Sequence, residues 1–212
     1  MMEIKTVGPV DVAAPTKNEE ARIAYDSGSC LLEENKLDEA EKCFNKAIAL
    51  DPLYVDAMDH LGLVYRRQKR LAEAEEIYLK SIEINKKNKV PYQNLAIVYR
   101  LQNRIQEDFE LQKKLLELDP NDPEPYFSIG QLFFNTDDYE NAMAFNDKAI
   151  ELYINQKSPY IFDALYHKGI ILYVINELDE SLMYLEEAKK GNMNKEIIEN
   201  LINKIKERKN NN

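Results

Sequence analysis

Only a few side chains in the sequence commonly act as nucleophiles, general bases or metal ligands. They are two histidines, His60 and His167, and two cysteines, Cys30 and Cys43. No second metal ligand stands at a usual spacing from either histidine, and neither cysteine has a histidine beside it in the sequence. We therefore predict no catalytic residue, no metal site and no cofactor, and we interpret each histidine as a packing or groove-edge residue.

The other motifs that could carry chemistry are absent or unspecific. The sequence has no glycine-rich phosphate loop and no Gly-x-Ser-x-Gly elbow. Adjacent acidic residues such as Glu33-Glu34 and Glu75-Glu76 are common on solvated helix faces and do not indicate an acid–base pair. The sequence therefore predicts a protein that is not an enzyme.

The sequence contains an internal repeat, and this repeat defines the secondary-structure elements on which any functional site would lie. A turn of two polar residues, one large apolar residue and a polar helix start recurs five times. Three of its steps are 34 residues long and the last is 39. The turns begin at Asn35, Lys69, Asn103, Asp137 and Asn176. A small residue precedes each turn in the same register, where a missing side chain lets two helices approach closely. These residues are Gly28, Gly62, Ala96, Gly130 and Gly169.

The segment after each turn repeats as well. Large residues lie between small ones at Phe44, Tyr78 and Leu185, and Pro52 and Pro120 follow two of the expected second helices. This pattern resembles the tetratricopeptide repeat family over roughly residues 21–195. The resemblance implies an all-α fold: a right-handed superhelical solenoid of antiparallel helix pairs, with about five repeats and a C-terminal capping helix. The sequence departs from the family pattern, and we expect looser packing or a local shift, at Asp108, Gln112, Phe145, Asn146 and Lys168.

We predict a flexible N-terminal arm over residues 1–17 and a single solenoid domain over residues 18–209. The extra length of the last step predicts a longer second helix in repeat four that ends near Ser158-Pro159. The capping helix is expected over residues 194–209, because five apolar residues share one face there: Ile197, Ile198, Leu201, Ile202 and Ile205. The repeats are expected at about residues 21–54, 55–88, 89–122, 123–156 and 162–195.

In the resembled family, the first helix of each pair lines a concave groove. Carried onto this sequence, the groove positions hold arginines and amides in the N-terminal half and aromatic residues in the C-terminal half. Arginine can pair with carboxylates of a peptide, side-chain amides can hydrogen-bond its backbone, and aromatic rings can contact its apolar anchor residues. The predicted peptide-binding residues are Arg66, Arg67, Gln93, Asn94, Arg100, Phe127, Gln131, Phe134, Tyr166 and Tyr173. In the alternative interpretation these arginines, with Arg70 and Arg104, form a solvated edge, and the aromatic residues pack between repeats.

The resemblance implies a protein–protein interaction module: an adaptor, a scaffold or a chaperone-like protein that binds an acidic or aromatic-bearing peptide segment of a partner. The alternative is a structural subunit of a larger assembly, or a homo-oligomer such as a homodimer, that uses the convex or end surfaces. Some members of the family clamp the acidic C-terminus of chaperones. Only Asn94 fits the residues that this clamp requires, so we do not expect it here.

Composition restricts the partners and the location. The formal net charge is −10, so we expect neither nucleic-acid binding nor a polybasic membrane patch. No stretch approaches the length of an apolar membrane span, and the first residues lack a secretion signal, so we expect a cytoplasmic protein. Cys30 and Cys43 fall on the two helices of one repeat. We expect free thiols there, with a pairing of the two left open.

Overall fold

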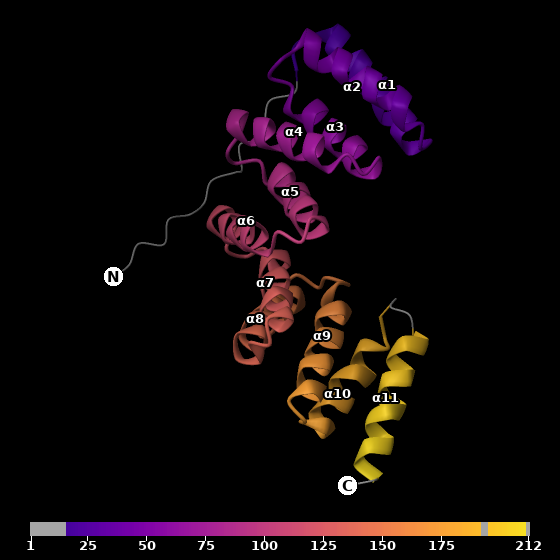
Figure 1. Cartoon of the computed structure of the whole chain (residues 1–212), viewed down its shortest axis with the longest axis vertical. Coiled ribbons are helices and arrows are strands. Elements are labelled where there is room, and N and C mark those ends of the chain that lie inside the picture. The colour runs from indigo at the N-terminus through magenta and orange to yellow at the C-terminus, as the bar shows by residue number, and fades with distance from the viewer. Residues whose placement is uncertain (1–15, 192–194, 211–212) are drawn as a thin grey trace, which may run out of the picture. The chain divides into compact units, whose positions relative to one another are not determined.

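The computed structural model describes residues 16–191 and 195–210. Within these residues the chain forms eleven α-helices and no strand (Figure 1). The all-α fold predicted from the repeat is therefore confirmed, while residues 1–15 of the expected N-terminal arm lie outside the described residues. The helices are α1 Glu19–Glu33, α2 Leu37–Leu50, α3 Val55–Arg67, α4 Leu71–Ile84, α5 Lys89–Leu101, α6 Ile105–Leu118, α7 Pro123–Asn135, α8 Tyr139–Asn155, α9 Ile161–Val174, α10 Leu178–Ala188 and α11 Lys195–Asn210.

The helices pack as consecutive pairs. Helix α1 packs on α2, α3 on α4, α7 on α8 and α9 on α10. Second helices also contact the helix that follows them, as α2 contacts α3, α4 contacts α5 and α8 contacts α9. First helices contact one another as well, α1 with α3, α3 with α5 and α7 with α9. This nearest-neighbour packing is the solenoid arrangement that the repeat predicts.

Each pair turns at a residue with left-handed backbone geometry. The next residue donates its N–H to the carbonyl five positions earlier, as Arg70 does to Tyr65 at 2.9 Å. This bond closes a Schellman motif, which satisfies carbonyl groups that a helix C-terminus otherwise leaves open. The aligned turns therefore share one backbone geometry. Their left-handed residues have φ values from 58° to 70° and are Asn35, Lys69, Asn103, Asp137 and Asn176.

The aligned glycines make room for large side chains of the second helices. A Cβ added to Gly62 would lie 2.5 Å from the ring of Tyr78, so only glycine fits against that ring. Repeat four differs, because Asn146 stands in the aromatic position. There a Cβ on Gly130 would meet the backbone oxygen of Ala142 at 3.2 Å. The first arrangement recurs where Gly28 faces Phe44 and where Gly169 faces Leu185.

The expected longer second helix of repeat four is present. Helix α8 has 17 residues, whereas α2 and α4 have 14 each. It ends at Asn155, and Lys157 then takes a left-handed φ of 52°. A left-handed residue thus redirects the chain here, in place of the Asp-Pro sequence that follows α2.

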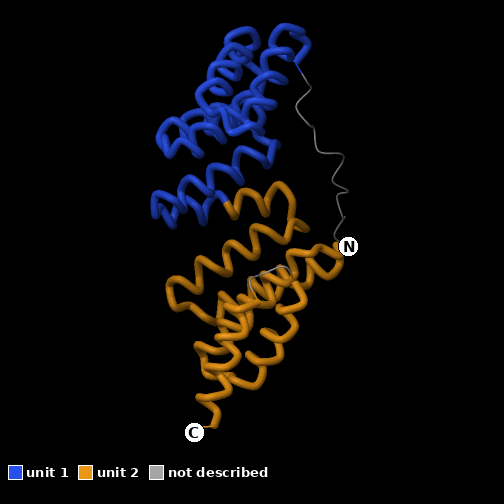
Figure 2. The backbone as a smooth tube through the Cα atoms, turned by 90° about the vertical axis from the view of Figure 1, so that its right-hand side faces the viewer, with its two compact units in different colours: residues 1–111 blue, residues 112–212 orange. Residues whose placement is uncertain are grey.

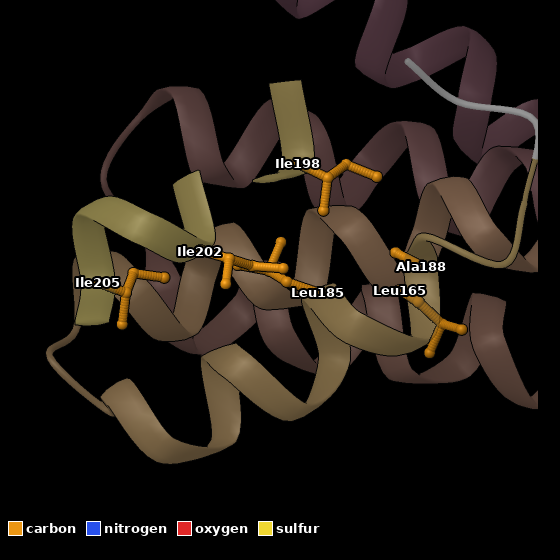
Figure 3. Close-up of a cluster of buried hydrophobic side chains, with 6 residues drawn as sticks. All are labelled: Leu165, Leu185, Ala188, Ile198, Ile202 and Ile205. Atoms are coloured by element: carbon orange, nitrogen blue, oxygen red, sulfur yellow. The ribbon is translucent and has the colours of Figure 1, made fainter. Parts of the chain in front are cut away.

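The chain divides into two compact units, residues 1–111 and 112–212 (Figure 2). The first unit has apolar clusters between its pairs, such as the one that joins Phe44 and Leu61. In the second unit, side chains of α11 complete the core (Figure 3). The predicted repeat limits and the single-domain organisation stay predictions. The core cluster of the second unit consists of Leu165, Leu185, Ala188, Ile198, Ile202 and Ile205.

Candidate functional site

In the first unit, the predicted peptide-binding residues lie on two neighbouring first helices. Helix α3 carries Arg66 and Arg67, and α5 carries Gln93, Asn94 and Arg100. Arg66 and the two amides are half-buried, whereas Arg67 and Arg100 are exposed. The Nε atom of Arg66 is buried and has no hydrogen-bond partner among the described residues. Helices α3 and α5 contact each other, so these polar residues lie on neighbouring first helices, one of which carries an unsatisfied buried donor.

Two other arginines of the basic group join neighbouring repeats. Arg70 on the turn before α4 lies 2.7 Å from Glu41 on α2. Arg104 on the turn before α6 lies 2.7 Å from Glu75 on α4. These two side chains hold one repeat against the next. The alternative interpretation assigned these two arginines to a solvated edge, but both are half-buried and paired between repeats.

Arg100 is tied to the protein interior. Its Nε atom lies 3.1 Å from the carboxylate of Asp108, which is completely buried. Asp108 stands where the other repeats have a small residue, so the ion pair shows how repeat three accommodates the substitution. Arg100 remains a predicted peptide-binding residue, but its guanidinium already has an ionic partner.

An aromatic cluster covers the start of α3. The rings of Tyr25 and His60 meet edge to face with centroids 5.1 Å apart, and Tyr25 Oη lies 3.4 Å from His60 Nδ1. The same histidine nitrogen lies 2.9 Å from the carbonyl oxygen of Asp56. His60 on α3 therefore contacts Tyr25 on α1. This agrees with its interpretation from the sequence as a packing or groove-edge residue.

Asp59 on the first helix α3 has a buried carboxylate. It is 5% exposed and accepts hydrogen bonds from Ser81 Oγ at 2.6 Å and from Asn88 Nδ2 at 3.0 Å. Burial raises the pKa of Asp59 from 3.8 to about 6, against the effect of these two bonds. Since Ser81 lies on α4 and Asn88 caps α5, Asp59 joins three successive helices. The sequence pattern gave no signal for this role.

In the second unit, the predicted aromatic residues surround a buried histidine. The rings of Phe127 and Phe134 on α7 approach His167 on α9 edge to face, with centroids 5.6 Å and 5.3 Å away. Asn146 donates to the carbonyl of Ala164 at 3.0 Å, so its Oδ1 accepts the Nδ1–H of His167 at 3.2 Å. Burial lowers the pKa of His167 to about 4, so the ring is neutral near pH 7.

The remaining predicted residues of the second unit lie on α7 and α9. Gln131 is half-buried on α7. Tyr166 and Tyr173 are half-buried on α9 and pack against the core cluster that α11 completes. The structure thus joins Phe127 and Phe134 through His167, and it places the two tyrosines closer to α11.

A small cavity lies on the side of the second helices in the first unit, where sequence reasoning predicted no site. Its volume is about 250 Å³. Leu61 and Tyr65 of α3 lie beside apolar residues of α2 and α4, and charged residues complete the lining. Sequence periodicity offers no signal for this cavity, because it forms between helices of different repeats. The other lining residues are Asn45, Ile48, Glu73, Glu76, Ile77 and Lys80.

Three features of the described residues bear on other classes of function. No cluster of three or more His, Cys, Asp or Glu residues in residues 16–191 and 195–210 could hold a metal ion. Over the same residues, every helix is too short or too polar to cross a membrane. Cys30 is exposed, Cys43 is half-buried, and both are free thiols.

Comparison with protein families agrees with this geometry. Residues 13–119, half of the chain, match the family described as the middle TPR-like domain of cilia and flagella-associated protein 70. Residues 123–153 match the tetratricopeptide repeat itself. The chain belongs to the tetratricopeptide repeat family. No curated protein sequence matches the chain as a relative.

Solved tetratricopeptide repeat proteins share this fold. The MamA protein is 19% identical, with 81% of this chain and 91% of MamA covered at a TM-score of 0.68. YrrB, described as having an unusual peptide-binding site, is 22% identical, with 82% and 87% covered at 0.62. PilF of Pseudomonas aeruginosa is 21% identical, with 84% and 80% covered at 0.71. At these identities the likeness establishes the fold, and a tetratricopeptide repeat fold is a protein–protein interaction module.

Proposed function

We propose that the chain binds a peptide segment of a partner protein along the first helices of its repeats. One observation carries the proposal. Within the described part of the first unit, the buried Nε of Arg66 has no acceptor, and the half-buried Gln93 and Asn94 on the next first helix make no side-chain hydrogen bond within the protein. A buried donor without a partner is costly, so a ligand that supplies an acceptor to Arg66 is favoured, and the two amides are available to hydrogen-bond the same ligand.

The chemistry of these groups indicates the kind of peptide. Side-chain amides pair with the backbone of an extended segment, and Arg66 and Arg67 suit its carboxylates. In the second unit, Phe127 and Phe134 suit an apolar or aromatic anchor. The first unit therefore suits an acidic segment, and the second unit suits a segment that bears an aromatic or apolar residue. YrrB shows that a protein of this fold with a peptide-binding site exists, which supports the proposal by analogy.

The test uses peptides selected from a displayed random library on the full chain. Arg66→Glu and Asn94→Ala should each weaken the selected peptides by about tenfold, because each removes a charged or hydrogen-bonding partner. Lys80→Glu, on the exposed side of α4, is the matched control and should change binding by less than about twofold. If the peptides bind both first-helix variants as they bind the wild type, the proposal is wrong.

A second candidate function is that of a structural subunit that uses the second helices. The cavity beside Ile48 and Ile77 favours it, because these half-buried apolar side chains could receive a side chain from a neighbouring protein or a second copy. Light scattering over a concentration range tests the homo-oligomeric form. A mass that stays at one chain, together with peptide binding that depends on Arg66, would favour the peptide-binding function.

We also infer a reducing, cytoplasmic location. The free thiols of Cys30 and Cys43 support it, because exposed thiols persist where the surroundings are reducing. Thiol labelling of the chain in its native cells tests the inference. Recovery of both cysteines in an oxidised form would contradict it.

A further inference from the structure

Two positively charged side chains of α11 converge on one aromatic ring of α9. The Nζ atom of Lys204 lies 6.0 Å from the ring centroid of Tyr173, and the guanidinium carbon of Arg208 lies 5.5 Å from it. Both cations are exposed, and the tyrosine is half-buried against the core cluster. Figure 1 shows α9, α10 and α11 at the C-terminal end of the second unit.

The neighbouring lysines of this region already have acidic partners. Lys206 lies 3.8 Å from Glu186, and Lys209 pairs with Asp179. Lys189 likewise contacts Glu199 at 3.1 Å.

Lys204 and Arg208 differ from these lysines, because neither has an acidic partner among the described residues. They stand one helical turn apart on α11, so their like charges repel each other. The ring of Tyr173 attracts both cations and restricts two long side chains that would otherwise be mobile. The result is a pair of ordered positive charges without a counter-charge.

We propose that Lys204, Arg208 and Tyr173 form a binding site for a carboxylate of an acidic peptide segment. The inference rests on the proposed function and specifies it, because it places an acidic residue of the bound segment beside α11. Arginine can bind a carboxylate through two parallel hydrogen bonds. A nearby lysine ammonium group attracts the same carboxylate without requiring a particular orientation. Tyr173 acts as a positioning residue that pre-orders both cations and so lowers the entropic cost of binding.

The charge of the chain favours a short acidic segment over a nucleic acid. Two cations can neutralise one or two carboxylates, whereas tight binding of a nucleic acid needs a broad basic surface that releases many counterions. The formal net charge of −10 repels a long polyanion.

A fluorescent hexaglutamate peptide, titrated into the full chain at low salt, is the probe. The double variant Lys204→Gln and Arg208→Gln should bind it about tenfold more weakly. The matched control, Lys157→Gln with Lys195→Gln, removes two exposed cations that have no acidic partner among the described residues, and should change affinity by less than about twofold. Tyr173→Leu keeps an apolar side chain against the core, and it should weaken binding several-fold while the circular dichroism spectrum stays unchanged.

Three results would overturn the inference: no binding of hexaglutamate to the wild type, an equal loss in both double variants, or no loss in either. If an oligothymidylate bound as tightly and depended on the same two cations, the site would bind polyanions in general, and the proposal of an acidic peptide ligand would be wrong. The outcomes separate this site from the proposed function. If library-selected peptides still depend on Arg66 while hexaglutamate binding ignores Lys204 and Arg208, only the carboxylate site is wrong.

Discussion

Arg70 and Arg104 stand 34 residues apart and make the same contacts in successive repeats. Each lies 2.7 Å from a glutamate of the preceding repeat, Glu41 for the first and Glu75 for the second. Each guanidinium also covers the ring of the tyrosine five residues before it, at 4.3 Å and 4.2 Å from the centroid. The same arginine–glutamate ion pair and arginine–tyrosine contact thus recur in successive repeats, and they stabilise the packing of adjacent repeats within the first unit.

Replacing Arg70 with methionine should lower the urea midpoint of unfolding. Methionine keeps an apolar stem against Tyr65 but loses the ion pair with Glu41, so the loss should shrink in high salt, which screens the wild-type pair. Arg67→Met is the control, because Arg67 is exposed and has no acidic partner among the described residues. Equal shifts in both variants, or a loss that salt does not change, would show that the ion pair is not the cause.

Lys69→Asn should stabilise the protein by about 1 kcal/mol, because asparagine tolerates left-handed geometry better than lysine does. Lys69 has a φ of 62° at a position where three of the other aligned turns have asparagine. Lys69→Ala removes the same charge but keeps the unfavourable geometry, so it should stay near the wild type. The urea midpoints of unfolding of the wild type and the two variants distinguish an effect of backbone geometry from an effect of charge. An alanine variant as stable as the asparagine variant would make the charge responsible.

The turns and helix crossings were predictable from sequence because they depend on local spacing. A left-handed residue at Asn35 and its equivalents ends the first helix, and a small residue stands seven positions earlier, which is a glycine that admits a side chain of the next helix in three of the repeats. Both features repeat with the same period as the structure. The longer α8 was predictable for the same reason, since the extra residues appear as a longer step.

The pairing of polar side chains could not be predicted in the same way. Asp59 lies on a first helix, the element that the resemblance assigns to the groove, yet its carboxylate is buried and bound by Ser81 and Asn88 from other helices. Arg100 was predicted to bind a peptide or to lie at a solvated edge, and the sequence did not indicate its contact with a buried carboxylate. Helical periodicity gives the face on which a residue lies, but it does not say which neighbour covers that face. The convergence of Lys204 and Arg208 on Tyr173 was missed for the same reason.

The capping helix offers a sharp comparison between two adjacent isoleucines. Ile198 is completely buried against the core of the second unit (Figure 3), whereas its neighbour in the sequence, Ile197, is 54% exposed. Ile198→Ala should therefore cost about 2–4 kcal/mol through lost burial and a cavity, and Ile197→Ala should cost less than about 0.5 kcal/mol. Chemical denaturation measures both. Equal costs would mean that α11 does not pack on the core as described.

His167 should stay neutral well below the usual range of histidine. Because burial lowers its pKa to about 4, the stability that depends on the neutral ring is present above pH 6.5 and is lost as the pH falls through about 4. A proton NMR titration measures this, with the signal assigned through His167→Gln. A midpoint near 6.5 for that signal would show that the ring is solvated and that Phe127 and Phe134 do not enclose it.

Asp59 should make the first unit less stable as the pH rises. Its folded pKa of about 6 exceeds the ordinary 3.8, so its stabilising contribution is complete below pH 3.8 and is lost as the pH rises through about 6. The shift corresponds to about 3 kcal/mol. Asp59→Asn keeps an acceptor for one of the two donors and should raise the urea midpoint at pH 8 more than at pH 4. Asp56→Asn, on the same helix, controls for the loss of one charge. If Asp59→Asn changed the stability equally at both pH values, the pKa of Asp59 would not be raised in the folded protein, and the hydrogen bonds with Ser81 and Asn88 would offset the cost of burying its charge.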